Sequence, residues 1–286
     1  MKKQYQFGHA IIEIHLSEGI PIPENMQKFE CVCESIDRVY QIEDATSIAE
    51  VEHMFRANYP KAREIKREAI RVLTSGDIEC RILYFVGSAK PYGISIEEEG
   101  KTRVWVEQMT MPLLQYDTIF VSLLALEKLM LEKDCLILHS AYMCRKGKAV
   151  LFSAPSETGK STQANLWKKY RGTRTINGDR SLLIREADGW YAYGWPVCGS
   201  SEICCNETYQ IQAIVMLHQD KINSVEKLNG FPAVQRLMPE ITINMWNVEF
   251  QMKALDLIEK IVSEVPIYEL GCDISEEAVK CLESVL

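Results

Sequence analysis

The sequence lacks the features that would assign it to a membrane or nucleic-acid-binding class. No apolar run approaches the roughly 20 residues of a membrane-spanning helix. The basic and apolar start resembles a signal peptide only superficially, because His9, Glu13 and His15 interrupt it and no small-residue cleavage site follows. The net charge is −8, whereas nucleic-acid-binding proteins need an excess of basic residues to displace counterions. We therefore expect a cytoplasmic protein with neither a membrane nor a nucleic-acid partner.

The ten cysteines lack the spacing of a metal or redox site. No pair is arranged as Cys-x-x-Cys, and adjacent cysteines such as Cys204 and Cys205 rarely bridge each other. Internal repeats and low-complexity tracts are absent as well. Scattered cysteines of this kind are typical of free thiols in a reducing compartment.

Residues 1–112 are predicted to form a β-rich region. Short apolar or alternating runs separated by Gly, Ser or Asp are typical of strands. They are HAIIEIHL, EAIRVL, CRILYFVG, YGISIEEEG and TRVWVEQMT. Between them, SIAEVEHMFRANYPKAREIKRE is ambiguous and could be a helix that ends at Pro60. We find no catalytic motif in this region, whose predicted role is to hold a substrate.

The 286 residues suffice for one large or two modest globular domains, and the character of the chain changes near Met111 and Pro112. We expect a second domain over residues 113–286. YDTIFVSLLALEKLMLEKD has helical spacing over about five turns and contains Asp117 near its start. CLILHSAYMC and AVLFSA flank the short turn RKGK, which predicts an antiparallel hairpin. The last predicted helix, in DISEEAVKCLESVL, has a capping-box spacing that starts at Asp273.

The stretch LFSAPSETGKSTQANLW is a phosphate-loop candidate. It matches Gly-x-x-x-x-Gly-Lys-Ser/Thr except that Ala154 replaces the first glycine, and it lies between a strand and a helix, as that motif requires. Backbone N–H groups of residues 156–161 would converge on phosphate oxygens at the positive end of the helix. Lys160 would reach the β and γ phosphates, and the Ser161 hydroxyl suits Mg²⁺. A helix start with a solvated lysine is the alternative.

The predicted fold class is therefore α/β, with a mixed sheet and a phosphate loop entered from an antiparallel hairpin, joined to a β-rich N-terminal region. Two residues of the loop depart from the pattern. Ala154 is tolerable where its φ is negative. Glu157 brings a negative charge to the loop, and its carboxylate could face the phosphates, the solvent, a metal ion or a basic substrate.

Four side chains outside the loop are candidates for chemistry. Asp179, in TINGDRSLL, could bind a metal or accept the proton of an attacking hydroxyl, or could be a turn residue. His139 belongs to the strand that pairs with the one entering the loop, so it could point toward the γ-phosphate or be a structural histidine. Arg174 and Arg180 could neutralise charge on a transferred phosphoryl group or be ordinary surface arginines.

Three segments together resemble a known family. LILHSAYM, AVLFSAPSETGKSTQA and INGDR are similar to the C-terminal domain of HPr kinase/phosphorylase and its phosphoenolpyruvate carboxykinase-like relatives, above all to HPr-kinase-related proteins of bacterial peptide-modification clusters. The resemblance covers residues 116–286. It implies Mg²⁺ near Ser161 and Asp179, and a catalytic role for Asp179 with His139 close by. It also implies that the nucleotide is bound by Ser156, Glu157, Thr158, Gly159, Lys160, Ser161 and Thr162.

The predicted activity is that of an ATP- and Mg²⁺-dependent kinase that transfers the γ-phosphate to a Ser or Thr hydroxyl of a peptide or protein. The catalytic candidates are Asp179, His139, Lys160 and Arg180. The GWPVCGSSE loop and the N-terminal region would hold the acceptor. The alternatives are a free amino-acid kinase, a carboxykinase-like enzyme, or a nucleotide-binding module without turnover. Gly178 stands where the family often has a second carboxylate, which favours the nucleotide-binding module without turnover. Both a monomer and a homo-oligomer as in HPr kinases stay open.

Overall fold

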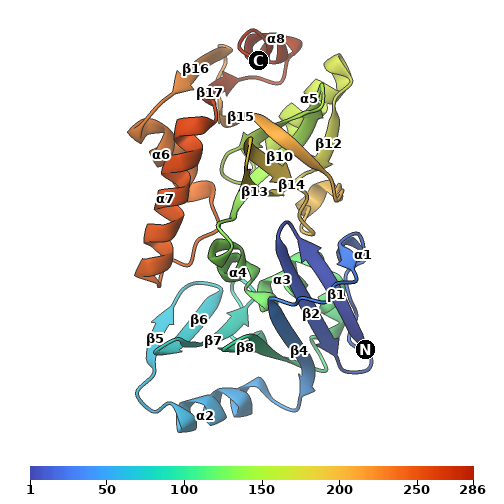
Figure 1. The fold of residues 1–286 in the computed structure, drawn as a ribbon, viewed down its shortest axis with the longest axis vertical. Coiled ribbons are helices and arrows are strands. Elements are labelled where there is room, and N and C mark those ends of the chain that lie inside the picture. The colour runs from blue at the N-terminus through green and yellow to red at the C-terminus, as the bar shows by residue number, and fades with distance from the viewer. The chain divides into compact units, whose positions relative to one another are not determined.

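The computed structural model describes residues 1–286, and the chain divides into two compact units, Met1–Leu126 and Glu127–Leu286. With 30% helix and 39% strand in two mixed sheets, and with a strand-rich N-terminal region, it confirms the predicted fold class (Figure 1). None of its helices combines the length and the apolar character needed to cross a membrane. All ten cysteines are free thiols, as expected.

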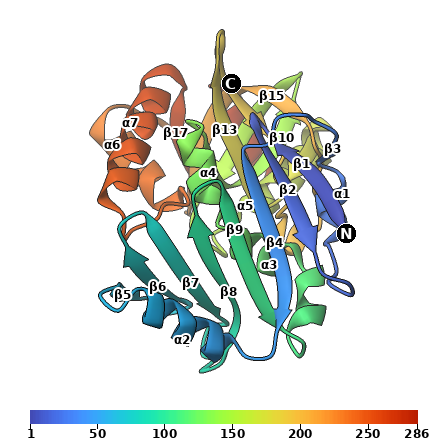
Figure 2. The same ribbon diagram turned by 60° about the horizontal axis from the view of Figure 1, so that its bottom comes forward.

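The first unit is built on a nine-stranded sheet in the order β3-β1-β2-β4-β9-β8-β7-β6-β5. Its strands are β1 (Lys2–Phe7), β2 (Ala10–Leu16), β3 (Glu30–Cys31), β4 (Arg38–Ala45), β5 (Arg63–Lys66), β6 (Ile70–Ser75), β7 (Ile78–Tyr84), β8 (Pro91–Glu98) and β9 (Lys101–Glu107). Its helices are α1 (Glu24–Gln27), α2 (Ile48–Asn58), the 3₁₀ helix η1 (Met111–Gln115) and α3 (Asp117–Leu124). The sheet is mixed because β4 runs parallel to both β2 and β9, as Figure 2 lets the reader follow.

Helix α2 covers part of this sheet. Its apolar side chains Ile48, Val51 and Phe55 pack in one buried cluster with residues of β6, β7, β8 and β9. The helix ends at Asn58, two residues before Pro60, because proline cannot continue a helix without a clash. The predicted helix ending at Pro60 is thus confirmed.

The second unit is built on an eight-stranded sheet in the order β11-β10-β13-β14-β15-β17-β16, with β12 paired to β10. Its strands are β10 (Leu136–Arg145), β11 (Lys148–Ser153), β12 (Arg174–Asn177), β13 (Arg180–Glu186), β14 (Gly189–Tyr193), β15 (Thr208–Gln219), β16 (Ser224–Leu228) and β17 (Ile267–Cys272). Its helices are α4 (Leu126–Glu132), α5 (Lys160–Arg171), η2 (Gly199–Ser201), α6 (Phe231–Leu237), η3 (Met238–Glu240), α7 (Val248–Glu264) and α8 (Glu276–Glu283). β10 and β11 form the predicted antiparallel hairpin.

Strand β11 is held on both sides. It pairs antiparallel with β10 and parallel with β15, and so closes a circuit through β13 and β14. Successive side chains of a strand point to opposite faces, and β11 follows this rule. Leu151 belongs to the core that contains α6 and α7, and Phe152 belongs to the core that contains α5 and α8. The strand that enters the loop is therefore fixed by pairing and by two cores.

Two predicted details are wrong. The single helix expected after Asp117 is two helices, α3 and α4, because Ala125 adopts a left-handed φ of 50° that interrupts the backbone. The capping box expected from Asp273 and Glu276 is absent, because α8 has Ser275 as its N-cap. Asp273 instead accepts a hydrogen bond from the backbone N–H of Ser275 (2.9 Å), in the turn before the helix.

Candidate functional site

The phosphate-loop candidate, residues 154–159, connects β11 to α5. Ala154 is buried in the core with Phe152 and does not have a positive φ, so the replaced glycine is not required there. Glu157 and Gly159 do adopt positive φ values, of 65° and 117°. Glu157 therefore occupies the strained left-handed conformation, and its side chain is exposed.

The N-terminus of α5 offers unpaired backbone donors. The N-cap is Gly159, which has no side chain to cap the helix, and the first intrahelical bond runs from Gln163 N–H to the Gly159 carbonyl (2.9 Å). The N–H groups of Lys160, Ser161 and Thr162 precede that bond and have no partner within the helix. Together with the positive end of the helix dipole, they make this end a site for an anion.

Lys160 lies beside these donors with its side chain buried. Its ammonium donates to the carbonyls of Ala154 (2.8 Å) and Pro155 (3.2 Å), so in the free protein it ties the loop to itself. Burial lowers the pKa of Lys160, although the nearby carboxylates of Glu240 and Asp179 work against that shift. A phosphate would offer this cation a stronger partner than the two carbonyls.

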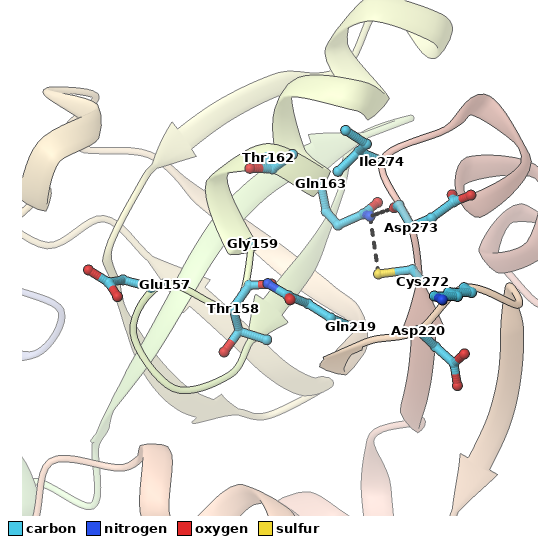
Figure 3. A pocket seen from close by; sticks show the side chains of 11 residues that line it. Glu157, Thr158, Gly159, Thr162, Gln163, Gln219, Asp220, Cys272, Asp273 and Ile274 are labelled. Carbon is cyan, nitrogen blue, oxygen red and sulfur yellow. Dashed lines mark hydrogen bonds between the residues drawn. The ribbon is translucent and has the colours of Figure 1, made fainter.

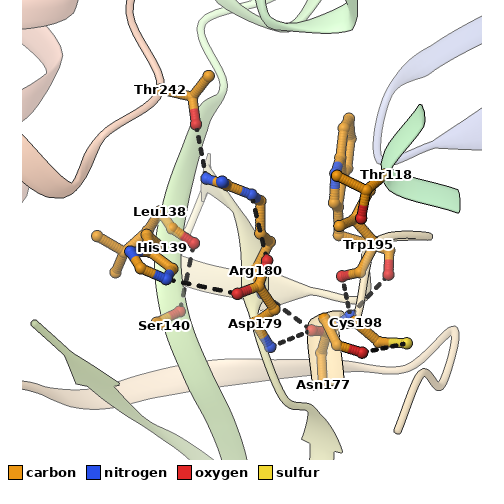
Figure 4. A network of polar contacts seen from close by, with 12 residues as sticks. Thr118, Leu138, His139, Ser140, Asn177, Asp179, Arg180, Trp195, Cys198 and Thr242 are labelled. Atoms are coloured by element: carbon orange, nitrogen blue, oxygen red, sulfur yellow. Dashed lines mark hydrogen bonds and ion pairs between the residues drawn. The ribbon is translucent and has the colours of Figure 1, made fainter. Parts of the chain in front are cut away.

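Asp179 is held by a turn that Asn177 organises (Figure 4). Asn177 is fully buried; its amide nitrogen donates to the carbonyls of Trp195 (2.7 Å) and Val197 (3.1 Å). Its side-chain oxygen accepts from the N–H groups of Asp179 (2.8 Å) and Arg180 (2.9 Å). No sequence pattern marks Asn177 for this role, yet its bonds fix the candidate carboxylate between β12 and β13.

Gly178 leaves no room for a second carboxylate beside Asp179. A Cβ atom at this position would lie 1.7 Å from the hydroxyl oxygen of Ser201 and 2.2 Å from its Cβ. Any side chain at position 178 therefore requires Ser201 to move. A second carboxylate at position 178 is therefore incompatible with the present place of Ser201.

A second carboxylate nevertheless reaches the site from far away in the sequence. His139, on β10, lies with Nε2 3.4 Å from Oδ1 of Asp179 and with Nδ1 3.1 Å from Oε2 of Glu240. Glu240 belongs to η3 and is 8% exposed. No motif or spacing in the sequence marks Glu240, so its place in the site could not be predicted.

The electrostatics around Asp179 favour its ionised form. Burial raises the pKa of Asp179, but His139, Arg180 and Lys160 together outweigh burial and hold the pKa below its usual value. The carboxylate is therefore charged at neutral pH, as a metal ligand or a hydroxyl-orienting group must be.

Of the two candidate arginines, one lies at Asp179 and one does not. Arg180 contacts the Asp179 carboxylate (Nε to Oδ2, 3.4 Å) and donates to the hydroxyl of Thr242 (3.0 Å). Arg174 is exposed and forms a two-point ion pair with Glu207, and it pairs with Cys144 toward the other end of β10. The structure thus does not bring Arg174 to the loop.

Two cavities flank the loop. The first, of about 320 Å³, we call the catalytic-side cavity. It is lined by His139, Ser156, Glu157, Gly159, Lys160, Ser161, Thr162, Gly178, Asp179 and Ser200. The second, of about 490 Å³, we call the Gln163-side cavity (Figure 3). It is lined by Glu157, Thr158, Gly159, Thr162, Gln163, Gln219, Asp220, Lys221, Cys272, Asp273 and Ile274.

The catalytic-side cavity has the groups that a magnesium–nucleotide complex needs. Ser161 and Asp179, the two expected metal ligands, line it together. The N–H groups at the start of α5 would face an anion bound there. Mg²⁺ usually takes only one or two protein ligands and completes its shell with water and phosphate oxygens. No group of three or more metal-ligating side chains occurs in the chain. The residues present fit Mg²⁺ bound together with phosphate.

Comparison with known proteins gives a matching family model and similar solved structures. The family described as SynChlorMet cassette protein ScmC matches residues 108–286, well over half of the chain. The HPr(Ser) kinase/phosphatase from Coxiella burnetii is similar in structure, with a TM-score of 0.33 and 9% identity, over 52% of this chain and 95% of that one. No curated protein sequence matches significantly. The family match alone assigns the family.

Proposed function

The chain belongs to the family of the SynChlorMet cassette protein ScmC, and we propose that it is a phosphotransferase that moves the γ-phosphate of ATP to a hydroxyl of a peptide or protein. The observation that carries this proposal is the meeting of Lys160, Ser161 and Asp179 in one cavity at the N-terminus of α5. A cation, a hydroxyl and an ionised carboxylate around unpaired N–H groups are the parts that phosphoryl transfer uses.

Binding of the phosphates is assigned to the loop and the start of α5. The N–H groups of Lys160, Ser161 and Thr162 would donate to phosphate oxygens, and the Lys160 ammonium would turn from the two loop carbonyls to the β and γ phosphates. When bound with ATP, Mg²⁺ would offset negative charge on the transferring group. Glu157 lines the catalytic-side cavity, but its side chain is exposed, so solvent screens its charge from the phosphates.

The acceptor hydroxyl is assigned to Asp179. Its ionised carboxylate would accept a hydrogen bond from the hydroxyl and orient its oxygen toward the γ-phosphate. His139 would keep that carboxylate in place through Nε2, while Glu240 fixes the ring through Nδ1. Arg180, at the other carboxylate oxygen, would steady Asp179 and supply positive charge next to the transferring group.

The acceptor would enter beside Ser200. This residue lies on η2, in the loop whose sequence GWPVCGSSE predicts substrate binding, and it lines the same cavity as Asp179. A peptide held along this loop would bring a Ser or Thr side chain to the carboxylate. A free amino acid would use the same carboxylate, so the two acceptor classes differ only in what the loop contacts.

A nucleotide-binding module without turnover is the second candidate. It is favoured by Gly178, which leaves one carboxylate next to the loop where a phosphotransferase of the resembled family often has two. The two candidates share ATP binding and differ in transfer.

The test is transfer of label from γ-³²P-ATP with Mg²⁺ to Ser/Thr-containing peptides, to the same peptides with Ala at every Ser and Thr, and to free serine and threonine. We expect label on the first set only, with the wild type and not with Asp179→Asn. Label on the free amino acids would select the small-molecule kinase. ATP binding with no transfer to any acceptor would select the binding module.

A further inference from the structure

We propose that the Gln163-side cavity holds the nucleoside half of the nucleotide, so that ATP crosses the loop with its base and ribose on this side and its γ-phosphate on the other. The inference rests on the proposed nucleotide-dependent function. It adds the residues that recognise the nucleoside and the direction in which the nucleotide lies.

The two cavities adjoin each other at the loop. Glu157, Gly159 and Thr162 line both of them, so a ligand whose phosphates lie on the loop would reach from one cavity into the other. The Gln163-side cavity, at about 490 Å³, is the larger. It falls in the size range of pockets that enclose a small organic ligand.

The carboxylates of the Gln163-side cavity argue against it as the γ-phosphate site. Asp220 and Asp273 line it together with one cation, Lys221, and Lys160 does not line it. Oδ1 of Asp273 already accepts from Asn223 (3.1 Å) and from the Ser275 N–H (2.9 Å), which fixes this carboxylate at the wall. Carboxylates repel phosphate but accept hydrogen bonds from hydroxyl and amino groups. The cavity therefore suits the uncharged, donor-rich part of a nucleotide.

Gln163 supplies a polar group that lacks a partner. It is 2% exposed, and its amide nitrogen donates to the Asp273 carbonyl (2.9 Å) and the Cys272 sulfur (3.1 Å) (Figure 3). These two acceptors fix which end of the amide is nitrogen. Its buried oxygen has no hydrogen-bond partner. An unpaired buried acceptor is costly, and a donor from the ligand would satisfy it after a small shift of the side chain.

Ile274 supplies the apolar surface. It lies between β17 and α8 at the edge of the cavity, and 78% of its surface is exposed. A planar base laid against it would remove apolar area of both partners from water. Donor groups near Gln163 and an apolar face at Ile274 together describe a nucleoside.

The experiment compares binding of ATP and of inorganic tripolyphosphate, each with Mg²⁺, by calorimetry. The wild type, Ile274→Gln and Ile222→Gln are titrated. Ile222 is a matched control, because it is 75% exposed and does not line the cavity. We expect the wild type to bind ATP at least tenfold more tightly than tripolyphosphate. Ile274→Gln should weaken ATP about tenfold and leave tripolyphosphate unchanged, and Ile222→Gln should change neither.

Two further nucleotides identify the donor that reaches Gln163. Purine riboside triphosphate lacks the exocyclic amine, and 2′-deoxy-ATP lacks one ribose hydroxyl. We expect one of them to bind more weakly than ATP. If both bind as ATP does, the assignment of Gln163 is wrong.

The failures are distinguishable. If the wild type binds ATP and tripolyphosphate equally, or if Ile274→Gln behaves as Ile222→Gln, the nucleoside lies elsewhere and this inference is wrong, while phosphate binding by the loop stands. If neither compound binds, the proposed function is wrong and this inference falls with it.

Discussion

The two cavities beside the loop share one wall and differ in kind. On one side Lys160 and Asp179 line the cavity together with His139, whose Nε2 lies 3.4 Å from the Asp179 carboxylate. On the other, Gln163 and Ile274 offer a neutral acceptor and an apolar face. The difference fits the proposed arrangement, with phosphoryl transfer on one side of the loop and the nucleoside on the other.

The titration of the side chains follows the same division. On the catalytic side, the pKa of Asp179 is held low and that of Lys160 is lowered by burial. On the other side, burial raises the pKa of the Cys272 thiol to about 11. The thiol therefore stays protonated at neutral pH and does not act as a nucleophile. The thiol on the Gln163 side is thus unreactive at neutral pH.

Lys160→Ala should have the largest effect and should remove the phosphate site altogether. Losing a charged donor from the loop should weaken binding of ATP and of tripolyphosphate about 100-fold, and transfer should fall at least as far. Calorimetry with both ligands measures this. Lys160→Arg, which keeps the charge, should retain part of the binding. Unchanged affinity for tripolyphosphate in Lys160→Ala would mean that the phosphates do not lie on this side.

Asp179→Asn should separate binding from chemistry. The amide keeps the shape of the carboxylate but accepts a hydroxyl hydrogen bond far less well, so transfer should fall by roughly 10²–10⁴-fold while ATP affinity changes little. Initial rates of label transfer and calorimetry measure the two effects. Asp256→Asn, at an exposed position of α7, is the matched control and should change neither. Full transfer by Asp179→Asn would refute the role assigned to this carboxylate.

Glu240→Leu should have an intermediate effect, because it acts through His139. Losing the acceptor for Nδ1 frees the ring, and transfer should fall about 10- to 100-fold. Glu240→Gln keeps an acceptor oxygen and should stay within a few-fold of wild type. The ¹⁵N shifts of the His139 ring report the cause: the Nδ1 signal should differ from wild type in Glu240→Leu and stay as in wild type in Glu240→Gln. Equal activity of the two variants would make Glu240 merely structural.

Glu157→Gly should have a small effect, chiefly on stability. Glycine relieves the left-handed backbone at φ 65° but gains freedom in the unfolded chain, so a net gain of about 0.5–1 kcal/mol is expected. Thermal unfolding measures it, and Glu157→Gln separates the backbone effect from the charge. ATP affinity should change by less than about threefold, because the carboxylate is exposed. A much larger gain in affinity would show that Glu157 opposes the phosphates.

The smallest expected effect concerns Cys272, which should not be alkylated at neutral pH. With a pKa of about 11, the Cys272 thiol is almost entirely protonated at pH 7.5, and only the thiolate reacts. N-ethylmaleimide should therefore leave Cys272 unmodified at this pH while the less buried Cys33 reacts. Peptide mass spectrometry reads both sites. Rapid labelling of Cys272 would place a reactive group in the Gln163-side cavity and end the contrast between the two sides.

The parts of the site that could be predicted are those set by local sequence. The strand, the loop and the helix start follow one another in the chain, so periodicity and the position of Gly159 and Lys160 were enough. Glu240 meets His139 across 101 residues of sequence, and nothing near either residue records that contact. The same limit applies to the fold. Most strands of the first unit could be predicted from their apolar patterns. The break at Ala125 could not, because it lies in a run with unbroken helical spacing.

The contact between Gly178 and Ser201 also restricts how this site can change by mutation. Restoring a second carboxylate with Gly178→Asp alone would force the new side chain into Ser201, so that step is blocked by the fold before its chemistry is tested. Making room with Ser201→Gly first removes the hydroxyl that donates to the Cys198 carbonyl (2.7 Å) and accepts from the Ile203 N–H (3.2 Å). The two positions must therefore change together, and in either order the first change is harmful. A library that varies them one at a time would miss the two-carboxylate form of this protein.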